Sequence, residues 1–233
     1  MNPISISNPL KVLFITWDSD QSNYLESLFF PIFEKLQEKG YAFHIVQFSW
    51  ALPKEINRIA QLAEASKLKY EHVPVWKTSP AFLGVVLSLL RSKKKVRQVI
   101  QQNQIQLVMP RSTMPSWWCL MNLKWIKRKK IKLIFDADGL PIQERVDYSG
   151  LNPKGLIYHL LHNIELKILI NADRVITRTN TSINWHLQRQ TDLPKEKFFK
   201  VTNGRDQGQF SIDLPSRSRI RQALKITDED CLL

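Results

Sequence analysis

The sequence predicts an α/β fold, in which helices cover both faces of a doubly wound parallel sheet. Short apolar runs of strand length alternate along the chain with longer segments whose apolar residues recur at helical spacing. The short runs lack the apolar–polar alternation of a half-exposed strand, which indicates that both of their faces are buried. Strands and helices that alternate in this way build a parallel sheet.

The first strand is expected at Lys11–Trp17, where KVLFITW forms an uninterrupted apolar run. Ser22–Lys39 carries apolar residues at helical spacing, and Gly40 follows it as a helix stop. The pattern then predicts a strand at Ala42–Phe48, a helix at Pro53–Ala65 with proline in its first turn, a weaker strand at Lys69–Val75 and a long helix at Pro80–Asn103.

The second half of the chain continues the alternation. We expect strands at Ile105–Met109, Ile131–Phe135, Asp173–Thr177 and Lys197–Thr202, and helices at Ser116–Lys129, Gly155–Asn171 and Thr181–Gln190. After Gly204 a linker-like stretch precedes a short basic helix at Ser216–Leu224, and TDEDCLL then resembles the lead into another strand. The sequence therefore predicts one domain over residues 1–206, and a linker with the start of a truncated second domain over residues 207–233.

Composition limits the classes of function. The 233 residues carry 34 Lys and Arg against 21 Asp and Glu, and the net charge of +13 attracts phosphate groups on nucleic acid, anionic lipid or a nucleotide-linked metabolite. Cys119 and Cys231 lie far apart without zinc-site spacing, so no metal or other cofactor is expected, and a reducing cytosol is the simplest setting. Neither a GxGxxG nor a P-loop motif is present, which argues against a dinucleotide site.

Polar residues follow the predicted strands at their carboxyl ends. In an open parallel sheet, ligands bind in the crevice outside these ends. We therefore expect the following residues to gather along one rim: Trp17, Asp18, Arg111, Ser112, Asp136, Asp138, Gly139, Thr177, Arg178, Asn203 and Gly204.

Several segments, in order along the chain, resemble the N-terminal half of family 4 glycosyltransferases of the GT-B class. MPRSTMPSWW and KLIFDADGLPIQERVDYSG are similar to an Arg-Ser strand end and to the family's F-D-x-x-G-x-x-x-x-E-R-V segment. LKILINADRVITRTNTSINWHL and KVTNGRDQGQF are similar to later strand ends, and RIRQALKITDEDCLL to the entry into a second domain. The resemblance runs from Lys11 to Leu233 and implies a Rossmann-like fold for the first domain.

The resemblance also implies retaining transfer of a sugar from a nucleotide-sugar to a saccharide or lipid-linked acceptor, at a cleft between two domains. This chain would supply the acceptor side, and the nucleotide-sugar site would lie in a missing C-terminal domain, so little activity is expected of the chain alone. Asp136 and Asp138 are the candidate catalytic residues. The candidate acceptor-binding residues are Trp17, Asp18, Arg111, Ser112, Gly139, Glu144 and Arg145, and those of the interdomain cleft are Thr177, Arg178, Asn203 and Gly204.

Two departures from the family pattern bear on the site. No Gly-Gly loop follows the first strand, where the chain reads TWDSDQSN. Asp138 stands where relatives often carry histidine or arginine. Because a carboxylate cannot donate a hydrogen bond to phosphate as arginine does, the handling of the acceptor is expected to differ here.

The candidate residues also have structural interpretations. Arg111 either contacts a phosphate of the acceptor or donor, or pairs with Asp136 or Asp138. The two aspartates face the same side of an extended chain, where they form an acid/base or hydroxyl-holding pair, or else cap a helix and bind the arginine. The structural interpretations of the others are core packing for Trp17, a surface pair for Glu144 and Arg145, and an interdomain turn for Asn203 and Gly204.

Basic residues adjoin apolar or tryptophan-bearing segments at two places, Arg91–Lys95 and Lys127–Lys132. We expect the apolar part of the helix at Pro80–Asn103 to pack in the core and the basic ends to contact an anionic membrane surface. This would place the protein in the cytoplasm, peripherally at the inner face of the cell membrane. The alternative function is a basic module that binds nucleic acid or membrane without catalysis, but no nucleic-acid-binding motif is present and nucleic acid is not an expected partner.

Overall fold

The computed structural model describes residues 8–19, 22–79, 81–190, 192–204, 213–227 and 229–230. The chain divides into two compact units, Met1–Asn203 and Gly204–Leu233. The first unit holds the sheet and every predicted rim residue except Gly204. The predicted linker before Asp213 lies largely outside the described residues.

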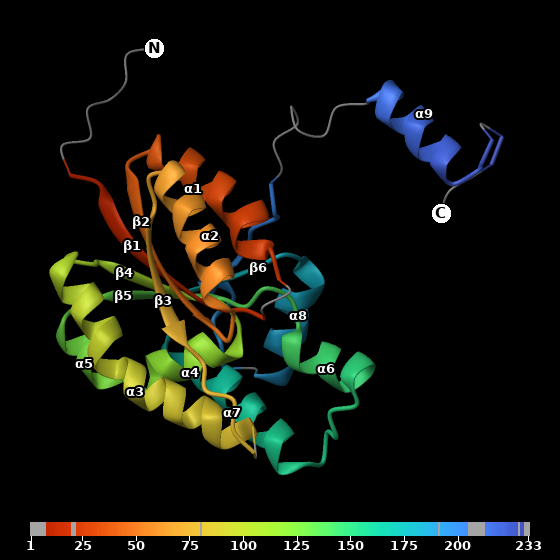
Figure 1. Ribbon diagram of the computed structural model, residues 1–233. Helices are drawn as coiled ribbons and strands as arrows, with labels where there is room; N and C mark the ends of the chain where they lie inside the picture. The colour runs from red at the N-terminus through yellow and green to blue at the C-terminus, as the bar shows by residue number, and fades with distance from the viewer. Residues whose placement is uncertain are drawn as a thin grey trace. The chain divides into compact units, whose positions relative to one another are not determined.

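The first unit is built on a seven-stranded sheet with the order β3-β2-β1-β4-β5-β6-β7, in which every pairing is parallel (Figure 1). The strands are β1 Leu10–Trp17, β2 Tyr41–Ser49, β3 Lys69–Pro74, β4 Leu107–Pro110, β5 Lys132–Asp136, β6 Arg174–Thr177 and β7 Phe198–Lys200. The doubly wound parallel sheet predicted from the sequence is confirmed. The strand order reverses between β1 and β4, which is where such folds bind their ligands.

Helices connect consecutive strands. They are η1 Leu25–Phe29, α1 Phe30–Gln37, α2 Pro53–Ala65, α3 Ala81–Gln102, α4 Thr113–Met121, α5 Leu123–Arg128, α6 Pro141–Ser149, α7 Leu156–Asn171, α8 Asn180–Arg189 and η2 Lys195–Lys197 in the first unit, and α9 Leu214–Ala223 in the second. The segment predicted as one helix at Ser22–Lys39 begins instead with a π-helical turn, η1, which continues directly into α1.

Both faces of the sheet are covered, as the unbroken apolar strands required. Helices α1 and α2 lie on one side of the sheet, and α3, α4, α5 and α7 on the other (Figure 1). Val12 and Phe14 of β1 belong to a core with η1, α1 and α2, whereas Leu13 and Ile15 belong to a second core with α3, α4, α5, α7 and α8. Successive side chains of a strand point to opposite faces, so a strand with two buried faces is mostly apolar on both.

The single helix predicted at Ser116–Lys129 is wrong, because α4 and α5 are separated at Asn122. This asparagine is buried. Its Nδ2 donates to the Trp118 carbonyl at 2.7 Å, and its Oδ1 accepts from Arg97 Nε of α3 at 2.9 Å. An asparagine side chain that bonds to the backbone competes with helix continuation.

Helix α6 is an element that the apolar pattern did not predict. Ile142 is its buried residue, so the apolar period is weak. Its two ends nevertheless carry readable signals. Pro141 opens the helix, and Gly150 closes it with a left-handed φ of 68°, donating its amide hydrogen to the Arg145 carbonyl.

Helix α3 approaches the loop after β3 closely at Gly84. A Cβ at this position would lie 2.0 Å from the Trp76 carbonyl oxygen, so a larger residue is excluded. One turn later, the Ser88 hydroxyl donates to the Gly84 carbonyl at 2.6 Å and accepts from the Trp76 amide at 2.8 Å. Within the described residues, no helix combines the length and apolar character needed to cross a bilayer.

Candidate functional site

The strands β1, β4, β5 and β6 are neighbours in the sheet, and their carboxyl ends form one rim. The rim carries Asp18 after β1, Arg111 after β4, Asp138 after β5 and Arg178 after β6. A parallel bridge between Arg111 and Asp136 extends the pairing of β4 and β5 up to this edge. Residues far apart in the sequence therefore lie close together, as the parallel topology predicted.

Arg111 is the centre of the rim. Its Nη1 binds Asp136 Oδ2 at 2.8 Å, and its Nη2 lies 2.7 Å from Asp138 Oδ1. Its guanidinium also lies 4.6 Å from the centre of the Phe29 ring, and the side chain is 11% exposed. Of the two interpretations of Arg111, the geometry supports pairing with the aspartates.

Asp136 is buried and holds Arg111 in position. Burial raises the pKa of Asp136, and the charge and hydrogen bond of Arg111 offset part of that rise. Its Oδ1 accepts from the Asp138 amide at 3.0 Å, and its carbonyl accepts from the Ser112 amide at 2.9 Å. Asp136 thus ties together the turns that follow β4 and β5.

Asp138 joins β5 to β6. Its backbone is left-handed, with a φ of 62°. Its carboxylate forms an ion pair with Arg178, and its carbonyl accepts from the Arg178 amide at 3.3 Å and from the Thr177 hydroxyl at 3.4 Å. Burial lowers the pKa of Arg178, and the positive charge of Arg111 lowers it further.

Ser112 has the most unusual backbone of the rim, with φ 63° and ψ −168°. This region is populated essentially by glycine, and other residues there carry strain of about 1–3 kcal/mol. The side chain of Ser112 does not cap α4, although its carbonyl accepts from the Ser116 hydroxyl at 2.7 Å. Strain of this kind concentrates at functional sites.

Asp18 belongs to a buried polar network that crosses β1, β2 and β3. It accepts from Gln47 Nε2 at 2.9 Å and from the Thr16 hydroxyl at 3.1 Å, and the Tyr70 hydroxyl donates to Gln47 Oε1 at 2.6 Å. Burial raises the pKa of Asp18, while its hydrogen bonds with Gln47 and Thr16 and the charge of Arg111 act in the opposite direction.

Gln47 and Tyr70 were missed from the sequence, because only residues beyond strand ends were considered. Their signal is a polar residue inside an apolar run, as in HIVQFS for Gln47. Glu26 was missed as well. It forms an ion pair with Arg58, and its charge contributes to the raised pKa of Asp18.

The remaining candidates lie at or beyond the edge of this cluster. Trp17 is half-buried and stacks on Phe48 at 5.3 Å, which matches the core-packing interpretation. Thr177 is buried beside Asp138. Exposed Glu144 accepts from the Leu140 amide at 3.4 Å, next to Gly139, and it forms no ion pair with exposed Arg145.

Asn203 is not joined to the cluster by any described contact. Asn203 is exposed beyond β7, at the edge of the sheet. Gly204 belongs to the second unit. Its φ is not left-handed, and a Cβ there would meet no atom within 4 Å, so the backbone does not require glycine at this position.

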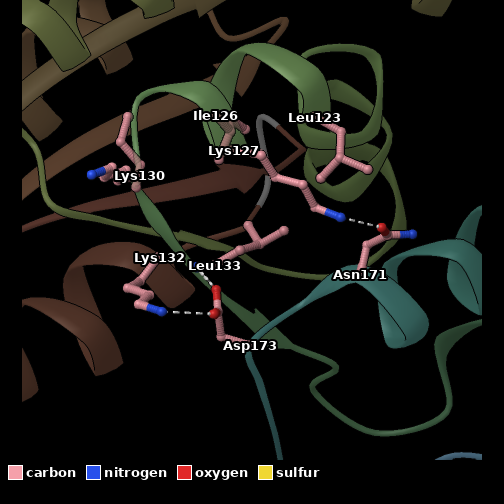
Figure 2. Close-up of a pocket in the computed structure, with 9 residues that line it drawn as sticks. Leu123, Ile126, Lys127, Lys130, Lys132, Leu133, Asn171 and Asp173 are labelled. Carbon is pink, nitrogen blue, oxygen red and sulfur yellow. Dashed lines mark hydrogen bonds and ion pairs between the residues drawn. The ribbon is translucent and has the colours of Figure 1, made fainter.

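A separate hollow of about 440 Å³ lies at the opposite edge of the sheet, near the amino ends of β5 and β6 (Figure 2). Lys127 Nζ donates to Asn171 Oδ1 at 2.9 Å, and Lys132 Nζ lies 3.1 Å from Asp173 Oδ1. Asp173 Oδ2 also accepts from the Leu133 amide at 2.8 Å. These contacts join neighbouring elements. Lys127 and Lys132 are therefore already bound by side chains of the protein itself. Among the described residues, no three His, Cys, Asp or Glu side chains gather as metal ligands would.

Comparison with known proteins gives the class of fold. No protein-family model matches the sequence, and no curated protein matches it. Among solved structures, the chain is similar to a UDP-GlcNAc 2-epimerase from Neisseria meningitidis bound to UDP-GlcNAc, with 13% identity and a TM-score of 0.59, over 94% of this chain and 55% of that one. It is also similar to a glycosyltransferase from Rickettsia africae, with 13% identity and a TM-score of 0.57, over 94% and 51%.

A third similar structure is a UDP-N-acetylglucosamine 2-epimerase from Rickettsia bellii, with 19% identity and a TM-score of 0.56, over 94% of this chain and 52% of that one. The chain thus spans about half the length of these structures. At such low identity the likeness shows the fold alone. That fold is the Rossmann-like, GT-B type found in glycosyltransferases and UDP-GlcNAc 2-epimerases.

Proposed function

We propose that this chain is the acceptor-side half of a glycosyltransferase that moves a sugar from a nucleotide-sugar, with retention, to a saccharide or lipid-linked acceptor. The observation that carries the proposal is the cluster at the carboxyl rim. Two arginines, two aspartates and two strained turns converge where folds of this kind bind ligands. The nucleotide-sugars named for similar proteins support a donor of that class.

In this proposal the rim holds the acceptor, and the donor site is supplied by a second domain. Ser112, Asp138 and Arg178 are the groups that line the solvent side of the cluster, while Arg111 and Asp136 position them. The catalytic role of Asp136 and Asp138 stays a prediction. Both carboxylates are engaged by arginine, which favours positioning over proton transfer.

We further propose that α3 docks the protein on an anionic membrane surface, where a lipid-linked acceptor would be found. The apolar part of α3 was expected to be in the core, but only one of its faces is buried. Leu83, Leu87 and Leu90 are exposed at helical spacing, and Lys94 continues the same face. An exposed apolar face that continues into basic residues suits a surface of anionic lipids.

Sugar transfer is tested with the product of the complete gene, a panel of radiolabelled nucleotide-sugars and a lipid extract as acceptor. We expect label to enter the extract with retention at the anomeric carbon. Arg111→Gln is expected to reduce the rate by about 100-fold or more, because it removes the ion-pair partner of Asp136 and one of the two partners of Asp138. The present chain alone is expected to transfer no sugar. Inversion at the anomeric carbon, or no transfer from any donor in the panel, would contradict the proposal.

A further inference from the structure

Two guanidinium groups converge on one carboxylate at the rim. Arg111 Nη2 and Arg178 Nη2 both contact Asp138 Oδ1, the first at 2.7 Å. The two arginines follow β4 and β6, the strands on either side of β5, and Asp138 follows β5. This arrangement creates a position that favours a negatively charged oxygen.

Carboxylate and phosphate oxygens are both bound by arginine through short, charge-assisted hydrogen bonds. The position between Arg111 and Arg178 would therefore suit a phosphate oxygen equally well if Asp138 were absent. The side chains of Asp138 and Arg178 are 28% and 38% exposed, although Asp138 Oδ1 itself is buried between the guanidinium groups. The chain itself already supplies the anion.

The charges of the cluster cancel one another, so no net positive charge is left to attract an external anion. Arg111 and Arg178 contribute two positive charges, and Asp136 and Asp138 contribute two negative ones. A phosphate entering here would have to displace a carboxylate that is attached to the chain, and would then face it at short range. Like charges at such a distance strongly disfavour binding.

The backbone holds Asp138 in place independently of its carboxylate. Its amide donates to Asp136 Oδ1 at 3.0 Å, and its carbonyl accepts from the Arg178 amide at 3.3 Å. Its φ of 62° is one that glycine and asparagine adopt readily. The carboxylate can therefore be removed by substitution while the turn keeps its conformation.

We propose that Asp138 is an internal counterion that occupies a latent anion-binding position between Arg111 and Arg178, and that it makes the rim select an uncharged, hydroxyl-bearing acceptor group over a phosphorylated one. The reference to an acceptor rests on the proposed function. The latent anion-binding position rests on the geometry of the three side chains alone.

The test is a titration of the 233-residue chain with inorganic phosphate, in which calorimetry measures binding at neutral pH and low salt. The wild-type chain is expected to show no saturable binding up to about 10 mM phosphate. Asp138→Gly is expected to bind about tenfold more tightly or better, because Nη2 of Arg111 and Nη2 of Arg178 lose their partner while Arg111 Nη1 stays on Asp136. Adding Arg178→Gln to Asp138→Gly is expected to abolish the gain. Glu71→Gln is the control, because it removes one negative charge from an exposed ion pair between Glu71 of β3 and Lys95 of α3.

Three results would overturn the proposal that Asp138 occupies an anion-binding position. Phosphate binding by the wild-type chain as tight as that of Asp138→Gly would overturn the proposal, and so would an equal gain in Glu71→Gln, which would indicate an effect of overall charge. A folded Asp138→Gly chain without binding would also overturn it. If that variant does not fold, Asp138→Asn replaces it, because asparagine keeps the size and tolerates the backbone. No sugar transfer is needed, so failure of the proposed function would be seen separately.

Discussion

Ser112 and Asp138 adopt backbone conformations that side chains rarely take, and both occur where a strand turns toward the rim. For Asp138 the carboxylate has a visible use, since it binds two arginines. Ser112 has no such compensation among the described contacts of its side chain. A residue that keeps an unfavourable backbone without a stabilising contact is a candidate for a role in binding.

Replacing Ser112 with glycine is expected to raise the free energy of unfolding by about 1 kcal/mol, because the strain of the left-handed turn exceeds the extra chain entropy of glycine. Urea denaturation measures the change. Ser66→Gly is the matched control, since Ser66 has an ordinary φ of −81° and glycine there is expected to lower stability. A loss of stability in Ser112→Gly would show that the turn is not strained.

Glu165 of α7 is a buried carboxyl group, 3% exposed, and burial raises its pKa to about 7, with Arg189 acting in the opposite direction. The folded protein therefore binds a proton that the unfolded chain releases at lower pH. Stability is full below the unfolded pKa and falls as the pH rises toward about 7, by about 3 kcal/mol in total.

Glu165→Gln is expected to remove this loss, so that the variant is more stable than the wild type at pH 8 and similar to it at acidic pH. Urea unfolding across this pH range measures the difference. Glu64→Gln on the exposed face of α2 controls for the loss of one negative charge. A stability difference that is the same at every pH would disprove the assignment to a titrating Glu165.

At the scale of elements, the sequence predicted what depends on burial and missed what depends on contacts between particular side chains of different elements. The helix predicted at Pro53–Ala65 was correct at both ends, because buried Ile59 and Ala63 give a clear helical period and Pro53 marks the start. The break at Asn122 was missed, since the asparagine side chain is held on the Trp118 carbonyl by a second contact with Arg97 of another helix. No single-segment pattern contains that information.

The α3 face gives a prediction at the same scale. The double substitution Leu83→Glu and Leu87→Glu is expected to reduce binding to phosphatidylglycerol-containing vesicles by about tenfold or more, because it places charges on the apolar face. Flotation of the chain with vesicles measures the bound fraction. Leu62→Glu, at an exposed position of α2, is the control and is expected to leave binding unchanged. Equal loss in both variants would assign binding to charge alone.

At the scale of the molecule, topology made the rim predictable. Parallel strands direct their carboxyl ends to one edge, so Arg111 and Asp138 could be placed on the same rim from the expected parallel sheet. The partners inside the cluster were not predictable in the same way. Gln47 and Tyr70 reach Asp18 across two neighbouring strands, and this depends on the register of β1, β2 and β3.

The net charge of +13 suits two kinds of macromolecular partner, an anionic membrane and nucleic acid. Their dependence on salt distinguishes them. Binding that depends on charge alone falls steeply with salt, and non-specific contact with DNA has dissociation constants of roughly 10⁻⁴–10⁻⁶ M at physiological salt. Vesicle binding through α3 adds an apolar component that salt does not screen. We therefore expect vesicle flotation to persist at a salt concentration that abolishes binding to a labelled DNA duplex, measured by fluorescence anisotropy. Binding to DNA that is tighter than this range and survives added salt would favour a nucleic-acid-binding module over membrane docking.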